Sequence, residues 1–133
     1  MTGNTFTTQT WDEHVVNGPD DGPRYAHVHA TFAYTGILEG TSSCDYLIYY
    51  ATEGYDDGNS QLAPGLERIE GSVDGHKGSF VARHDVRYGP DGITDNWTVV
   101  PGSGTGELAG LSGHGTAAGN STTIAYTFDY DLS

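Results

Sequence analysis

The sequence predicts an all-β protein that folds as a single antiparallel eight-stranded barrel, and three observations lead to this prediction. Gly contributes 20 of the 133 residues and Tyr another nine, a composition typical of strands joined by tight turns. Clusters of Gly, Pro and Asp divide the chain into segments of strand length. No segment carries apolar residues at helical spacing over three turns, so we expect neither a crossover helix nor a parallel sheet.

The clusters of turn residues mark where the predicted strands begin and end. They cover residues 5–12, 25–35, 43–51, 60–73, 78–88, 93–100, 105–116 and 122–131. The linkers are short, which favours antiparallel neighbours. A sandwich is the alternative architecture, but a closed barrel of this size, like that of the lipocalins and other calycins, leaves no exposed sheet edge and can hold one small ligand. Glycines within the strands are expected to supply the bends at barrel corners: Gly40, Gly71, Gly110 and Gly113.

Length and charge limit the classes of function. The length fits one domain over residues 1–133. Five Lys and Arg stand against 18 Asp and Glu, for a net charge of -13. A nucleic acid or an anionic membrane would need a basic surface, so we expect neither as a partner. Cys44 has no second Cys for a disulfide, and the N-terminal segment lacks the basic and apolar regions of a signal peptide, so the expected location is the cytoplasm.

Strand alternation separates the side chains that line the barrel from those on its surface. In the strand over residues 78–88, His84 shares a face with Phe80, Ala82 and Val86, which makes it a polar group in an apolar set. Glu67 shares a face with Ile69 in the same way. The other expected inner faces comprise Val28, Ala30, Phe32 and Tyr34, then Cys44, Tyr46, Ile48 and Tyr50, and finally Ile124, Tyr126, Phe128 and Tyr130.

The barrel interior is therefore the candidate site. A carboxyl and an imidazole in apolar surroundings are suited to proton transfer, so we predict Glu67 and His84 as catalytic residues. The predicted substrate-binding wall consists of Tyr34, Tyr46, Tyr50, Phe80, Trp97, Tyr126 and Phe128. The alternative is that Glu67 and His84 satisfy each other, or backbone groups, inside a packed barrel.

Other motifs give weaker evidence of a functional site. His27 and His29 lie two residues apart on an outer strand face, but no third ligand stands at a fixed spacing, so we predict no metal site and interpret them as surface or interface residues. The glycine-rich run at 102–106 lacks the Lys and the following helix of a phosphate loop and is interpreted as a bulged turn. Cys44 is interpreted as a small core residue rather than a nucleophile.

A family resemblance is carried by the run WTVVPGSGTGELAGL at residues 97–111. Further matching pieces are the segments 11–13, 39–40, 46–47, 65–68, 78–81 and 126–131, together with His84. On these residues the chain resembles the bacterial DUF3224 family over nearly its whole length. The resemblance implies a barrel similar to allene oxide cyclase, whose relatives include plant dirigent proteins and bacterial cyclases of polyketide-type substrates. It implies no activity. The stretch at residues 53–68 is longer than in the family pattern and carries Pro64, which fits either a specialised substrate or a drifted loop.

These observations lead to one preferred function and two alternatives. The preferred one is a cyclase or isomerase without cofactor, which acts on an apolar, polyketide-like or fatty-acid-like molecule in the barrel. The first alternative is a ligand-binding barrel for transport or sensing, and the second is a packed structural or interaction barrel. Leu47 and Val81, expected on the outer face, would suit the contact of a homo-oligomer.

Overall fold

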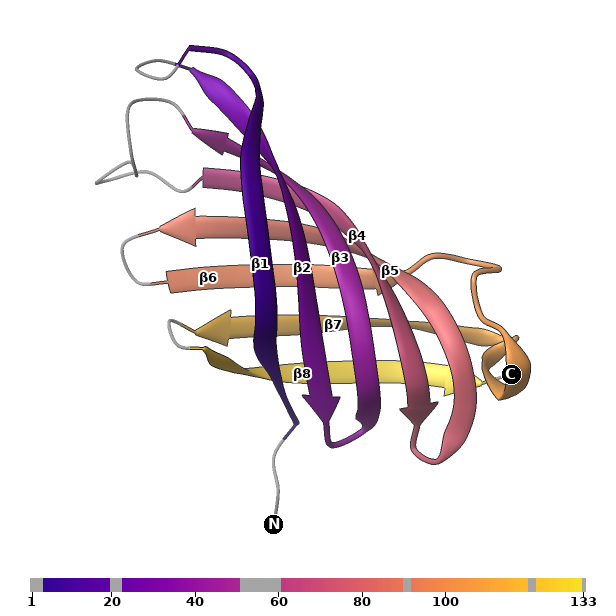
Figure 1. Cartoon of the computed structure of the whole chain (residues 1–133). Coiled ribbons are helices and arrows are strands. Elements are labelled where there is room, and N and C mark those ends of the chain that lie inside the picture. The colour runs from indigo at the N-terminus through magenta and orange to yellow at the C-terminus, as the bar shows by residue number, and fades with distance from the viewer. Residues whose placement is uncertain (1–3, 20–22, 51–60, 90–91, 120–121, 133) are drawn as a thin grey trace.

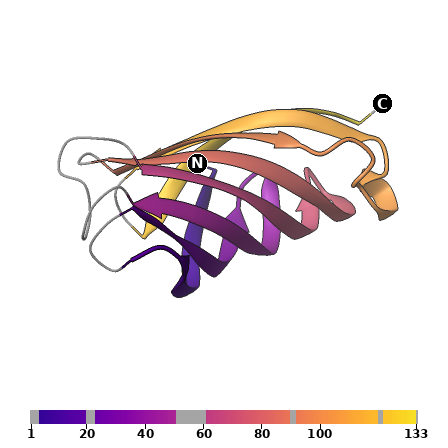
Figure 2. The ribbon, with the colours of Figure 1, turned by 90° about the horizontal axis from the view of Figure 1, so that it is seen from above.

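The computed structural model describes residues 4–19, 23–50, 61–89, 92–119 and 122–132, which form a closed barrel of eight antiparallel strands (Figure 1). Each strand pairs with its neighbours in sequence, and the last pairs with the first. The strands are β1 Thr5–Asn17, β2 Arg24–Thr35, β3 Leu38–Tyr50, β4 Gln61–Val73, β5 His76–Gly89, β6 Gly92–Val99, β7 Leu111–Gly119 and β8 Thr123–Leu132. Figure 2 shows β6–β8 along one side of the barrel and the earlier strands along the other. The predicted fold class is confirmed.

Two strands extend well beyond their predicted bounds. β1 continues to Asn17 instead of ending at residue 12, and β3 begins at Leu38 instead of residue 43. The β2–β3 turn is tight because Gly36 adopts a positive φ of 100°, which lets the chain reverse within two residues. The end of the strand at residue 35 was predicted correctly, but the sequence left residues 36–42 as a longer linker because a lone Gly is a weaker turn signal than a cluster.

The strand predicted over residues 105–116 is wrong in its first half. Residues 100–110 form a loop with one short 3-10 helix, η1 Gly106–Leu108, and β7 begins only at Leu111. Gly110 therefore lies in the turn before β7 and does not bend a strand. The loop folds onto β5, where Ser103 Oγ accepts a hydrogen bond from the Val81 N–H at 3.0 Å and Thr105 Oγ1 accepts one from the Ser79 N–H at 3.0 Å.

This loop also explains why Ser79, expected on the solvent face of β5, is buried. Its backbone carbonyl and hydroxyl are hydrogen-bonded to Thr105, at 2.8 and 2.7 Å. The inner faces are otherwise as strand alternation predicted: the predicted lining residues of β2, β3, β5 and β8 that the structure describes are buried, except Tyr130, which is partly buried. The side chain of Tyr50 lies outside the described residues.

A row of glycines crosses β3, β4 and β5 in register. Gly40 pairs with Gly71, and Gly71 pairs with Gly78. Gly40 and Gly71 have φ values of 152° and 153°, and a Cβ on Gly71 would lie 2.0 Å from the Glu39 carbonyl oxygen. Only glycine fits such a close approach of two backbones, so this row lets the sheet bend at a barrel corner, as predicted for Gly40 and Gly71.

Barrel closure rests on a short contact. Among the described residues, β1 and β8 pair between Thr5–Thr7 and Thr123–Ala125, and one backbone hydrogen bond at each end extends this contact to Thr8 with Thr122 and to Asn4 with Tyr126. The hydroxyl of Tyr126 adds a second tie, because it accepts a hydrogen bond from the Leu38 N–H at 2.9 Å and donates one to the Thr35 carbonyl at 2.8 Å. Within the described residues, no helix has the length and apolar character needed to cross a membrane.

The glycine row yields a first prediction. Replacement Gly71→Ala should lower the free energy of unfolding by at least about 2 kcal/mol, because the new Cβ meets backbone that cannot move aside. Gly75→Ala is the matched control: its φ is also positive, at 86°, but nothing lies within 4 Å of the added Cβ, so it should cost only about 1 kcal/mol. Urea unfolding of both variants measures the difference, and equal losses would contradict a role for close backbone contact.

Candidate functional site

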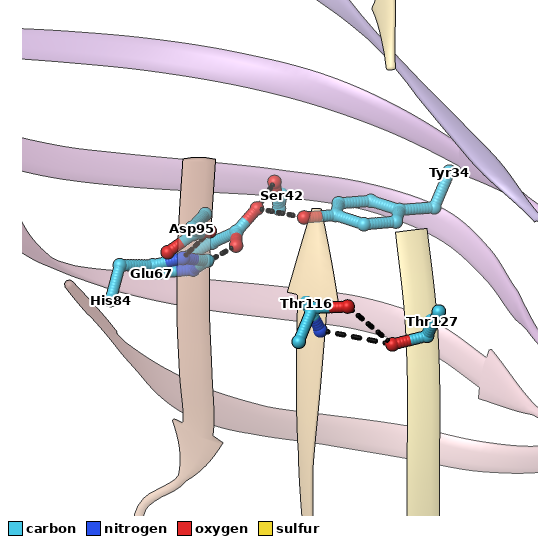
Figure 3. Close-up of polar contacts among 7 residues, drawn as sticks. All are labelled: Tyr34, Ser42, Glu67, His84, Asp95, Thr116 and Thr127. Carbon is cyan, nitrogen blue, oxygen red and sulfur yellow. Dashed lines mark hydrogen bonds and ion pairs between the residues drawn. The ribbon is translucent and has the colours of Figure 1, made fainter. Parts of the chain in front are cut away.

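Three ionisable side chains meet inside the barrel, one from each of β4, β5 and β6. His84 Nε2 lies 2.6 Å from Glu67 Oε1, and His84 Nδ1 lies 2.5 Å from Asp95 Oδ2 (Figure 3). Relative exposure is 1% for Glu67 and 5% for both His84 and Asp95. The imidazole therefore bridges two carboxylates away from solvent. We call Glu67, His84 and Asp95 the polar centre.

Strand register places these groups together. His84 is paired with Gly65 on β4 and with Trp97 on β6, so Glu67 and Asp95 each stand two residues from a direct partner of His84, on the same face. Long side chains reach across such diagonal positions in a sheet. Gly65 has no side chain because a Cβ there would come within 2.6 Å of the Tyr46 ring. The missing side chain leaves room for Tyr46 beside His84.

Two hydroxyl groups complete the network around Glu67. Its Oε2 accepts a hydrogen bond from the Tyr34 hydroxyl at 2.7 Å and a short one from the Ser42 hydroxyl. Both oxygens of Glu67 and both ring nitrogens of His84 are thus engaged. In contrast, Asp95 Oδ1 is buried and has no hydrogen-bond partner among the residues that the structure describes. It is the acceptor in the polar centre that remains open to a ligand or to water.

The network fixes the charge states. Burial alone would lower the pKa of His84, but the charge of Glu67 and the hydrogen bonds to Asp95 and Glu67 outweigh it and raise the pKa to about 10. Burial alone would raise the pKa of Glu67, yet the charge of His84 and the hydrogen bonds from His84, Ser42 and Tyr34 lower it. Burial and the neighbouring Glu67 charge raise the pKa of Tyr34 well above its usual value. At neutral pH the centre therefore holds an imidazolium, an ionised Glu67 and a neutral Tyr34.

Aromatic rings surround the polar centre. Tyr46 and Trp97 flank the imidazole, with ring centroids 6.2 and 6.1 Å from it. Trp97 stacks on Phe128 at 4.7 Å, and Phe128 stacks on Phe80 at 6.1 Å. The centre thus lies in apolar, aromatic surroundings, where electrostatic interactions are stronger than in water.

The structure brings most of the predicted site residues together. Glu67 and His84 contact each other directly, which is the mutual satisfaction that the sequence left open. Tyr34 donates a hydrogen bond to the centre, whereas Tyr126 lies on the inner face with its hydroxyl tied to backbone. Tyr50 falls outside the described side chains. Cys44 is buried, and burial raises the pKa of its thiol, which favours the core interpretation over a nucleophile.

Sequence reasoning missed Asp95 and Ser42. Asp95 shares a face with Trp97 and Val99, so the alternation in β6 could have revealed it, but the inner face of that segment was ambiguous. Ser42 lay before the predicted start of its strand, and the early start of β3 places it on the inner face.

The outer face carries the other histidines. His27 and His29 both contact Asp45 Oδ1, at 2.9 and 3.0 Å, and the hydrogen bond from His29 is the largest of the effects that lower the pKa of Asp45. In the described part of the chain, no three His, Cys, Asp or Glu side chains are grouped so that they could hold a metal ion. Of the residues expected in an oligomer contact, Leu47 is exposed and Val81 is half-buried.

A hollow of about 390 Å³ also lies on the outer face of β6–β8. The exposed side chains that line it are short and uncharged: Thr94, Asn96, Thr116, Ala118, Ala125 and Thr127. The Thr116 and Thr127 hydroxyls are hydrogen-bonded to each other at 2.7 Å, as Figure 3 shows. Its exposed side chains therefore offer no acid or base, and Asp95 and Tyr126, which also border it, are buried and hydrogen-bonded inside the barrel.

Fold and site together define an antiparallel eight-stranded barrel with an ionised network buried in an aromatic interior. The family model described as "Protein of unknown function (DUF3224)" matches residues 2–130, so the chain belongs to the DUF3224 family. It is similar in fold to the crystal structure of a DUF3224 family protein of unknown function from Shewanella oneidensis MR-1. The identity is 22%, the TM-score is 0.73, and the match covers 98% of this chain and 97% of that one. No curated protein matches the chain.

The coupled charges predict how stability depends on pH. Because the pKa of His84 is raised from 6.5 to about 10, its stabilising contribution is complete below pH 6.5 and is lost as the pH rises toward 10. The lowered pKa of Glu67 adds a contribution that is present above its ordinary value of 4.5 and is lost at lower pH. His84→Gln should cost about 3 kcal/mol at pH 6, and the cost should shrink as the pH approaches 10.

Urea unfolding across the pH range measures this effect, with His114→Gln on the exposed face of β7 as the control. Two imidazole N–H signals of His84 that persist at pH 8 in an NMR spectrum of the wild-type protein would support the doubly protonated state independently of any variant. A cost of His84→Gln that does not change with pH would contradict it.

Proposed function

We propose that the barrel binds a small apolar molecule and moves a proton on it, as an isomerase or cyclase that needs no cofactor. The observation that carries this proposal is the buried polar centre with its unpartnered Asp95 Oδ1. Withdrawing ionised groups from water costs several kcal/mol per ion, and groups held in such a setting cluster at functional sites.

The geometry supports a division of roles. Asp95 Oδ1 is the acceptor with a free lone pair, so it serves as the base that takes a proton from a carbon beside a carbonyl group and returns it to another carbon. His84 already uses both ring nitrogens and acts through Asp95, which it orients and whose charge it balances. Glu67 in turn orients His84. The roles predicted for Glu67 and His84 thus become positioning roles, and the carboxylate that contacts substrate is Asp95.

The aromatic wall supports cyclisation as one form of this chemistry. Tyr46, Trp97 and Phe128 offer flat apolar faces that would hold a flexible chain in a folded, reactive conformer. The family resemblance in the sequence implies a barrel similar to allene oxide cyclase, and a cyclisation would agree with that implied analogy of fold.

A second candidate is a barrel that binds its ligand unchanged, for transport or sensing. The engagement of every polar atom of Glu67 and His84 favours it, because a pKa of about 10 keeps the proton on His84 throughout the neutral range.

Proton exchange separates the two candidates. An apolar unsaturated ketone incubated with the protein in heavy water should incorporate deuterium beside its carbonyl group, as followed by NMR. Asp95→Asn should slow this exchange by at least about a hundredfold, because the base is lost. Asp85→Asn, an exposed carboxylate on β5, is the matched control and should keep the wild-type rate. Binding of the ketone with exchange no faster than in buffer would sink the catalytic proposal in favour of the binding barrel.

A further inference from the structure

The second half of β1 opens the barrel interior to solvent. After an irregularity between Thr8 and Thr10, Trp11 pairs with Ala30, Glu13 with Val28 and Val15 with Ala26. These partners on β2 are fully buried core residues, so Trp11, Glu13 and Val15 stand on the inner side of the sheet. Nevertheless Trp11 is 45% exposed and Val15 is 44% exposed. Inner-facing residues reach water here because, among the described residues, the contact of β1 with β8 ends at Thr8 and does not continue along the second half of β1 (Figure 1).

A short chain of rings leads from this opening to the polar centre. The Trp11 ring lies 6.4 Å from the Tyr46 ring, and the Tyr46 ring lies 6.2 Å from the His84 imidazole. One aromatic side chain therefore separates a half-exposed tryptophan from the buried charges. A molecule that rests on Trp11 and displaces or slides past Tyr46 would meet the polar centre next.

The charges along this route are mainly negative. Glu13 accepts a hydrogen bond from Trp11 Nε1 at 3.1 Å at the opening. Inside, the two carboxylates Glu67 and Asp95 share one imidazolium, and no donor from the described part of the chain reaches Asp95 Oδ1. Arg24, the basic residue at the start of β2, is already engaged in an interaction. A carboxylate ligand would thus add a further negative charge to a site of low dielectric, which is strongly unfavourable.

We propose that the site takes neutral or cationic apolar molecules and rejects free carboxylates such as fatty acids: the acidic C–H of a ketone substrate faces Asp95 Oδ1, or the hydrogen-bond donor of an amine or an alcohol takes that place. Trp11 and Glu13 form the entrance and Asp95 Oδ1 is the anchor for the donor. The exposed Trp11 face and Tyr46 also suit a cation, through cation–π contact. This inference rests on the ligand site of the proposed function, and it narrows the class of substrate.

Three probes with one hydrocarbon body test the charge preference: phenylbutylamine, phenylbutanol and phenylbutyrate. Titration calorimetry at low salt should give the amine at least about a tenfold tighter Kd than the carboxylate, with the alcohol between them. Asp95→Asn should remove most of the advantage of the amine over the carboxylate. Because that variant can lose stability, Glu13→Gln at the exposed entrance provides a second test and should reduce the advantage by about threefold. Asp12→Asn, the neighbouring acid on the outer face, should not change it.

The entrance is tested separately. Trp11→Ala should weaken binding of the alcohol and the carboxylate by about tenfold, because it removes an aromatic contact, and binding of the amine by more, because the cation–π contact is lost as well. Tyr49→Ala, an exposed aromatic on the outer face of β3, should leave binding intact. Equal or tighter binding of phenylbutyrate, or no binding of any probe, would overturn the inference. If the protein prefers the amine but does not exchange the protons of the ketone, the proposed proton transfer alone is rejected. If it exchanges the ketone protons but binds the amine and the carboxylate equally well, this inference alone is rejected.

Discussion

The sharing of one imidazolium between two buried carboxylates constrains the whole barrel. Each contact joins adjacent strands, Glu67 on β4 to His84 on β5 and His84 to Asp95 on β6. Loss of one partner would leave a buried charge without compensation, at a cost of about 3 to 5 kcal/mol. A shift of register by one residue would turn these groups to the outer face and break every contact. The chemistry of the centre and the pairing of the central strands therefore depend on each other.

The surrounding side chains follow from this constraint. Tyr34 and Ser42, from β2 and β3, supply the donors that Glu67 needs, so five consecutive strands contribute to one network. Position 65 is a glycine, which leaves room for the Tyr46 ring that lies against it. At the same time the described residues leave one oxygen of Asp95 without a hydrogen bond, although a barrel selected only for stability would gain from satisfying it. That imbalance is the feature that points to a ligand.

Much of the architecture could be predicted from the sequence, because strand alternation is a local property. It placed Glu67, His84 and Tyr34 on inner faces, and the structure agrees. It did not single out Asp95, which shares a face of β6 with Trp97, although Asp95 lies only 11 residues from His84 on the next antiparallel strand. The role of Trp11 depends on an irregularity in β1, which reverses the faces of the later residues and leaves little trace in composition. Residues 101–104 were correctly predicted as a linker, but residues 105–110 were misassigned to a strand, whereas the loop is held by hydrogen bonds to β5.

The two hydrogen bonds of the Tyr126 hydroxyl to the β2–β3 turn have a consequence for folding during synthesis. They join the end of the chain to the turn after β2, across 91 positions from Thr35 and 88 from Leu38. During synthesis the first strands leave the ribosome long before β8 is made. The edge of β1 that pairs with β8 is therefore unpaired during this time. Contacts of such wide sequence separation form slowly. A growing chain of this protein therefore remains an open, aggregation-prone sheet until β8 has emerged and paired with β1.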